Sequence, residues 1–72
     1  MEKVEIKTEY IKLEQLLKLA GLVGSGSEAK MVIGMSLVRV NGSIELQRGK
    51  KLRNGDIVEY KGGKYIVEQH FH

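Results

Sequence analysis

Residues 37–46 read Leu-Val-Arg-Val-Asn-Gly-Ser-Ile-Glu-Leu, and this stretch decides the fold. Apolar and polar side chains alternate on both sides of Asn41-Gly42, which is typical of half-buried strands. Asn-Gly favours a tight turn in which both residues have positive φ. The sequence therefore predicts an antiparallel hairpin in the middle of the chain.

The chain after this hairpin is predicted to remain largely β-structure. Residues 47–54 are rich in basic and polar side chains and are expected to form a loop. Turn residues at 54–56 precede the alternating stretch 57–60, and Gly62-Gly63 separates it from a second alternating stretch at 65–68. These segments extend the hairpin into a small antiparallel sheet.

The chain before the hairpin carries two helical patterns. Residues 12–20 place apolar side chains at helical spacing and are expected to end at Gly21. Ser25 and Glu28 fit a capping box, so a second helix is expected from there to about residue 35. Residues 4–7 alternate as a further short strand. Two short helices packed on a small antiparallel sheet give an α+β fold, with residues 1–72 as a single domain.

Composition excludes several classes of function. The chain has no cysteine, which removes disulfides and thiolate metal sites and suits a reducing cytoplasm. The apolar stretch 16–23 is too short to span a bilayer, and the N-terminus lacks the apolar core of a signal peptide. The 6% aromatic content argues against a base-stacking platform for single strands. A globular domain with a polar partner is the expected class.

The positive charge is concentrated in one segment. Residues 29–56 hold six lysines and arginines against two carboxylates, a balance of +4, within a chain whose net charge is +3. This pattern is typical of an electrostatic footprint for a polyanion, and it also fits a solvated loop.

An ordered set of motifs then resembles a known family. It consists of Lys12-Leu13-Glu14-Gln15-Leu16-Leu17-Lys18, Ser27-Glu28-Ala29-Lys30, Val38-Arg39-Val40-Asn41-Gly42 and Gly55-Asp56-Ile57-Val58. Residues 11–59 are similar in order and spacing to the RNA-binding domain of small-subunit ribosomal protein S-four, often called the alpha-L motif. The resemblance is to short, stand-alone bacterial members, whose loop after the hairpin reads much like Arg48-Gly49-Lys50-Lys51-Leu52.

The resemblance implies a non-catalytic protein that binds structured RNA. Ribosomal RNA is the implied target, and a monomeric, cytoplasmic, ribosome-associated or assembly factor is the implied role, with ribosomal proteins as further partners and no cofactor. Many larger relatives carry arginine at the position of Gly26 and glycine at the position of Ser36. The first difference removes one expected phosphate contact, and the second predicts strain in the turn after the second helix.

Ten residues are the candidate RNA contacts, because a phosphate needs a cation or an amide dipole directed at it. They are Lys12, Ser25, Gly26, Ser27, Lys30, Arg39, Arg48, Lys50, Lys51 and Arg53. Several fit a second interpretation. The serine-glycine run is also a plain helix cap, Arg39 also fits a solvated strand face, and Lys12 also fits a helix-surface charge. Of Lys50 and Lys51, an extended backbone would turn one away.

Three other functions compete with RNA binding. An enzyme is disfavoured, because His70 and His72 are the histidines of the chain and form an incomplete metal or catalytic set near its end. The segment His70-Phe71-His72 fits a tail or a tag remnant. A sulfur-carrier role fails because Gly62-Gly63 is internal. The alternative that stays open is a protein–protein adaptor, with the strands at 57–60 and 65–68 as a free sheet edge and Tyr60, Tyr65 and Phe71 as an apolar patch.

Overall fold

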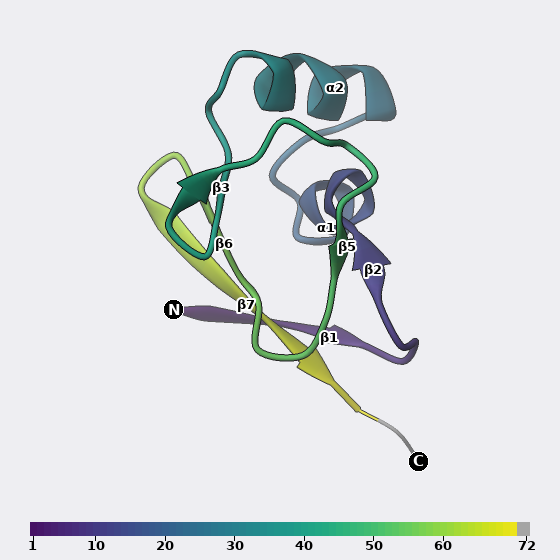
Figure 1. Cartoon of the computed structure of the whole chain (residues 1–72). Helices are drawn as coiled ribbons and strands as arrows, with labels where there is room; N and C mark the ends of the chain where they lie inside the picture. Colours follow the sequence, from purple (N-terminus) through teal and green to yellow (C-terminus); the bar gives the residue numbers. More distant parts are fainter. Residues whose placement is uncertain (71–72) are drawn as a thin grey trace.

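The computed structural model describes residues 1–70 of the chain, and Figure 1 shows the order of its elements. Two helices lie on one side of the strands. The elements are β1 (Glu2–Ile6), β2 (Ile11–Lys12), α1 (Leu13–Leu19), α2 (Gly26–Gly34), β3 (Arg39–Val40), β4 (Ser43–Ile44), β5 (Lys51–Leu52), β6 (Ile57–Tyr60) and β7 (Gly63–Gln69). The predicted α+β class, with two short helices and a small sheet, is confirmed.

The main sheet has the strand order β1-β7-β6-β3-β4. Its pairs are antiparallel except β1 with β7, which run parallel with Val4 opposite Val67. The sheet is therefore mixed, whereas the sequence predicted an antiparallel one. The parallel pair joins the two ends of the chain, and no local turn signal announces such a contact.

A second, two-stranded ladder was absent from the sequence prediction. β2 and β5 pair antiparallel, with Ile11 opposite Leu52 and Lys12 opposite Lys51. Each strand has two residues, too few for a period to be recognised, and both lay inside segments assigned to the first helix or the basic loop. Lys12 is consequently a strand residue that immediately precedes α1, and the loop ends before Lys51.

The core lies between the helices and the sheet. Its apolar side chains come from α1, α2 and the inner faces of both β layers, and no polar side chain is buried with them in residues 1–70. The largest fully buried members are Leu13, Leu16, Leu17, Ile33, Val38, Leu52, Val58 and Val67. Apolar burial is therefore the main stabilising term, as expected for a chain without disulfides.

Both helices end in the same hydrogen-bond pattern. After α1, Gly21 N donates to Lys18 O and Leu22 N to Leu17 O; after α2, Ser36 N donates to Ile33 O and Leu37 N to Val32 O. This is the Schellman motif, which needs one left-handed residue. Gly21 supplies it with φ 73°, and Ser36 adopts φ 62°. The strain predicted at Ser36 is confirmed.

The central hairpin is tied to the following turn by two side chains. Asn41 and Gly42 have φ of 51° and 85°, as a tight turn of this kind requires. The Asn41 side chain accepts from Ile57 N at 2.9 Å and donates to the Asp56 carboxylate at 3.1 Å. Asp56 also accepts from Arg53 N at 2.8 Å. The Asn-Gly and Gly-Asp motifs therefore serve the fold.

Candidate nucleic-acid interface

The basic loop before β5 closes the start of α1. Leu13 N donates to Lys50 O at 2.9 Å, and Glu14 N donates to Arg48 O at 3.1 Å. The first amides of a helix have no partner within it, so these carbonyls satisfy donors that would otherwise be free. Gln15 Oε1 accepts from Lys12 N at 3.2 Å in the same turn. The backbone at Arg48 and Lys50 is fixed in place, and both side chains are exposed.

The β2–β5 ladder adds three cations to the same region. Lys12 stands directly opposite Lys51, so both side chains leave the same face of the ladder. Arg53 follows Lys51 by two residues and stays within 5.6 Å of the Tyr10 ring centre. We call Lys12, Arg48, Lys50, Lys51 and Arg53 the basic cluster.

Tyr10 holds two members of the basic cluster by cation–π contact. Lys51 Nζ lies 4.8 Å from the centre of the Tyr10 ring, and the Arg53 guanidinium lies 5.6 Å from it. Tyr10 is a residue of this region that the sequence motifs do not predict. Its signal was its position two residues before Lys12, which puts both on one face of an extended segment, but the strand was too short to be recognised.

The basic cluster carries charge that no ion pair within residues 1–70 neutralises. Within residues 1–70, the ion pairs shorter than 4 Å join Lys3 to Glu68 and His70 to Glu5 and Glu68. Glu14 is half-buried beside the cluster and forms none of these pairs. Like charges directly opposite on a ladder destabilise it. The arrangement of Lys12 and Lys51 therefore carries a small folding cost that an external anion would relieve.

The remaining candidate residues lie elsewhere. Ser25 caps α2 by accepting from Glu28 N at 3.1 Å, and the Glu28 carboxylate accepts from Gly24 N at 2.6 Å. This end of α2 thus already holds a carboxylate of the protein itself. Gly26, Ser27 and Lys30 are exposed on α2, which packs against α1. In Figure 1 the loop leading to β5 runs below α2 in the view, but the backbone contacts join it to α1.

Arg39 is separated from the basic cluster. It lies on β3, opposite Glu59 of β6, and its Nη1 donates to Gly42 O of its own hairpin at 3.3 Å. β3 and β5 lie on opposite sides of the molecule as drawn in Figure 1. The backbone thus brings five of the seven predicted cations to the start of α1 and leaves Lys30 and Arg39 apart.

The sheet edge assumed for an adaptor is not available. β7 is flanked by β1 and β6, and β6 by β7 and β3, so both are interior strands. Tyr60 is buried and Tyr65 half-buried, while Phe71 lies outside the described residues. The expectation of a free edge at residues 57–60 and 65–68 is therefore wrong, because the N-terminal strand covers it.

Residues 1–70 contain no group of three or more His, Cys, Asp or Glu side chains arranged to hold a metal ion. His70 contacts Glu68 and Glu5, and its backbone N donates to Ile6 O at 2.9 Å, while His72 lies outside the described residues. Neither α1 nor α2, the helices described in residues 1–70, has the length and apolar character to cross a membrane.

The chain is similar to known proteins in both sequence and structure. The chain is 44% identical over 59 residues to the probable ribosome maturation protein RlbA of Bacillus subtilis, covering 82% of this chain and 83% of the relative. It is 36% identical over 56 residues to the putative RNA-binding protein YbcJ of Escherichia coli, covering 78% and 80%. The solution structure of YbcJ, described as revealing an alpha-L motif involved in RNA binding, superposes with a TM-score of 0.72 at 32% identity, over 94% of this chain and 87% of that one.

The family model for the S4 domain matches residues 4–68. The match includes both helices, the central hairpin and the basic cluster. The family resemblance drawn from the sequence motifs is confirmed by the model, the relatives and the solved structure together. The chain belongs to the S4 domain family.

Proposed function

We propose that this protein is a non-catalytic RNA-binding module that grips the phosphate backbone of structured RNA. The observation that carries the proposal is the basic cluster around the start of α1, whose five cations have no carboxylate partner within 4 Å in residues 1–70. Phosphate contacts are made chiefly by such side chains. The names of the relatives, one a ribosome maturation protein and one an RNA-binding protein, support the same class of ligand.

The proposed mode of recognition is by shape. Lys50 and Arg48 are held by their backbone carbonyls, and Lys12 and Lys51 by their strands, so the backbone from which these cations project is fixed. Cations on such a backbone fit the phosphates of an RNA helix or junction, whose deep major groove hides the base edges. Ribosomal RNA is the proposed target, and a monomeric cytoplasmic factor in ribosome maturation is the proposed role.

The cap of α2 and Arg39 take a secondary place in this proposal. The amides of Gly26 and Ser27, together with Lys30, could hold one further phosphate near α1, although the Glu28 carboxylate opposes it. Arg39 would contact only an RNA that extends from the basic cluster to the β3–β4 hairpin. The basic cluster is the primary surface, and Ser25, Gly26, Ser27, Lys30 and Arg39 are the outer candidates.

The test is filter binding of a structured ribosomal RNA fragment across a range of salt concentrations. Contacts with about four to six phosphates give a log–log slope of affinity against salt of about −3 to −5. Replacing Lys50 and Lys51 with glutamine is expected to weaken binding and to reduce the magnitude of the slope by about two, since each lysine contributes about one.

The matched control removes two lysines elsewhere. Lys61 lies in the turn between β6 and β7, Lys64 lies at the start of β7, and both are exposed. In Figure 1 this turn is on the other side of the molecule from β5. Lys61→Gln/Lys64→Gln has the same change in net charge and should leave the slope unchanged. Equal weakening by both pairs would show diffuse attraction without a site, and salt-insensitive binding would favour a protein adaptor.

A further inference from the structure

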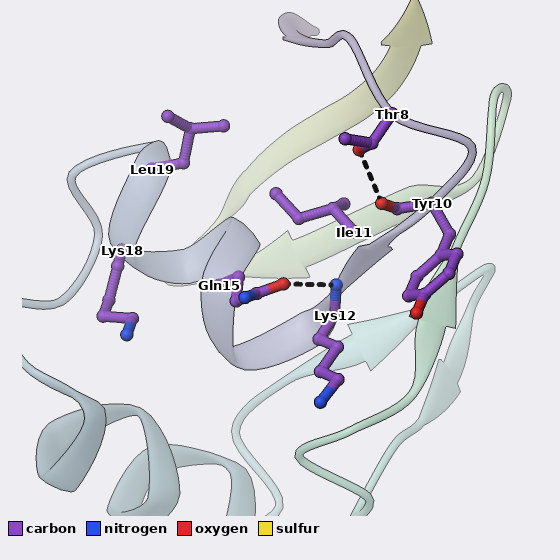
Figure 2. Close-up of a pocket in the computed structure, with 7 residues that line it drawn as sticks. All are labelled: Thr8, Tyr10, Ile11, Lys12, Gln15, Lys18 and Leu19. Carbon is purple, nitrogen blue, oxygen red and sulfur yellow. Dashed lines mark hydrogen bonds between the residues drawn. The ribbon is translucent and has the colours of Figure 1, made fainter.

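The outer edge of β2 is closed to a further strand. The outward carbonyl of Tyr10 accepts from the Thr8 hydroxyl at 2.8 Å. The outward amide of Lys12 donates to Gln15 Oε1 at 3.2 Å, and Figure 2 shows both bonds. A segment that adds to a sheet needs such backbone groups free. β2 therefore accepts no additional strand.

The outer edge of β1 is protected by charge. Ile6 O accepts from His70 N at 2.9 Å, so the backbone groups of Ile6 face β7 and those of its neighbour Glu5 face away from the sheet. By the same alternation, Lys3 directs its amide outward. The side chains of Lys3 and Glu5 are 70% and 66% exposed. Charged side chains on an edge strand disfavour pairing with another strand.

The outer edge of β4 has neither form of protection. Glu45 N donates to Val38 O at 3.0 Å, so the backbone groups of Ile44 and Leu46 point away from β3. β4 is the last strand of the main sheet, and no strand within residues 1–70 pairs with its outer side. The apolar side chains of Ile44 and Leu46 are 48% and 60% exposed. We call the outward backbone of residues 44–46 the β4 edge, and it offers free donors and acceptors beside apolar surface.

The outer face of the β3–β4 hairpin is apolar as well. Val38 is fully buried, so its neighbours Leu37 and Arg39 lie on the opposite, outer face. Arg39 stands opposite Ile44, and the ladder continued by two residues brings Leu37 opposite Leu46. Leu37 is 48% exposed. We call Leu37, Ile44 and Leu46 the hairpin patch. Exposed apolar side chains gathered in this way mark interaction surfaces.

The charges around the hairpin patch favour an acidic partner. Arg39 shares the face of the patch, and its Nη1 donates to Gly42 O at 3.3 Å, so the guanidinium lies at the hairpin turn. Glu59 stands opposite Arg39 on β6, but they form no ion pair within 4 Å. Glu45 points to the other face, and its carboxylate accepts from a backbone amide of the following loop. A carboxylate on the partner would therefore find Arg39 without a competing ion pair.

The same charges disfavour a second copy of this chain. Each copy has a net charge of +3, and Arg48 follows the β4 edge by two residues. Pairing of two β4 edges would bring the two basic loops close together, where like charges repel. An RNA strand is also a poor occupant, because it lacks the row of N–H and C=O groups that a sheet edge pairs with.

We propose that the β4 edge receives an extended segment of a partner protein as an additional strand of the main sheet. The backbone of the segment bonds to Ile44 and Leu46, its alternate apolar side chains pack on the hairpin patch, and an acidic side chain pairs with Arg39. Backbone bonds supply affinity in this mode of recognition, and side chains supply specificity. The inference goes beyond the proposed RNA-binding function and does not depend on it.

The test selects ligands from a phage-displayed library of random dodecapeptides, with the whole protein as the target. Enriched peptides are expected to alternate apolar residues over about five positions, the usual length of a strand, and to contain Asp or Glu. Hydrogen exchange measured by NMR on the complex with an enriched synthetic peptide should show new protection of the Ile44 and Leu46 amides.

Variants of Ile44 test the backbone bond. Because Ile44 N points away from β3, proline removes this donor without breaking a bond of the sheet. Ile44→Pro should weaken peptide binding by about tenfold, from the lost hydrogen bond and the bulk of the ring. Ile44→Val keeps the donor and should bind nearly as well as the wild type. Lys3→Pro makes the same backbone change at the edge of β1 and should leave peptide binding unchanged.

Circular dichroism checks that each variant is folded. If Ile44→Pro fails to fold, Ile44→Lys provides the same test, because it places a charge on the β4 edge at a half-exposed position. Its peptide binding should fall as well.

The outcomes separate this proposal from the RNA-binding function. A library without enriched peptides overturns the docking edge, and so does peptide binding that survives in both Ile44→Pro and Ile44→Lys. Self-association of the wild-type protein that Ile44→Pro abolishes would assign the edge to a second copy and overturn the proposal too. Ile44→Pro should bind structured RNA as the wild type does, and a parallel loss of RNA binding would place the edge in the RNA surface instead.

Discussion

Ser36 holds a backbone conformation that serine adopts at a cost. Its φ of 62° lies in the left-handed region, where a side chain costs about 1–2 kcal/mol relative to the right-handed region. The fold requires this geometry because Ser36 and Leu37 donate back to the last carbonyls of α2. A single residue therefore stores strain at the point where the chain leaves the helix for the sheet.

Replacing Ser36 with glycine should stabilise the protein. Glycine removes the steric cost but loses more entropy on folding, so the expected net gain in unfolding free energy is about 0.5–1 kcal/mol. Urea denaturation followed by circular dichroism measures it. Ser43→Gly makes the same chemical change in β4 and should instead destabilise the protein. A loss of stability in Ser36→Gly would contradict the argument.

At the scale of elements, the proposed RNA contacts of the β2–β5 ladder are predicted to lower the stability of the free protein. Lys12 and Lys51 repel each other across the ladder. Changing Lys12 to glutamate replaces this repulsion with attraction and places a carboxylate at the start of α1, which favours negative charge. We expect the unfolding free energy to rise by about 0.2–1 kcal/mol while RNA binding weakens.

Lys12→Gln is the reference for that experiment. It removes the repulsion without adding attraction, so its unfolding free energy should fall between those of the wild type and Lys12→Glu. Both variants should bind RNA more weakly than the wild type. If Lys12→Glu were less stable than the wild type, repulsion between Lys12 and Lys51 would not destabilise the fold.

The helices and strands differ in how well local sequence patterns predict them. The helices, the Asn-Gly hairpin and the strand at 57–60 follow from local period and turn chemistry, so they were predicted nearly to their ends. The sequence does not predict β2 and β5, because a strand of two residues is too short to show an alternating pattern. It does not predict the parallel β1–β7 pair either, because that pair depends on contact between the two ends of the chain. The loop predicted at 47–54 ends before Lys51 in the structure, and its attachment to α1 uses backbone carbonyls, which no side-chain pattern encodes.

For the whole molecule, salt should act in opposite directions on folding and on binding. The basic cluster repels itself in the free protein, so added sodium chloride should raise the unfolding free energy by an amount on the order of 0.5 kcal/mol. The same salt weakens the RNA complex by counterion competition. Thermal unfolding of the free protein measures the change in stability with salt, and filter binding over the same salt series measures the change in RNA affinity. Salt should raise the unfolding free energy of Lys50→Gln/Lys51→Gln less than that of the wild type. An equal rise in both proteins would show that the repulsion does not come from Lys50 and Lys51.

The carbonyls of Lys50 and Arg48 that close the first turn of α1 have a consequence for how the protein matures. Their partners, Leu13 and Glu14, are synthesised long before them, so the spacing of the cations does not exist until the later half of the chain has returned to the first helix. A full-length chain that has not yet folded back carries the same cations without their arrangement. The cations are therefore arranged for RNA binding only in the folded protein. An unfolded or misfolded copy carries the same charges without a defined arrangement, so it can attract RNA only unselectively.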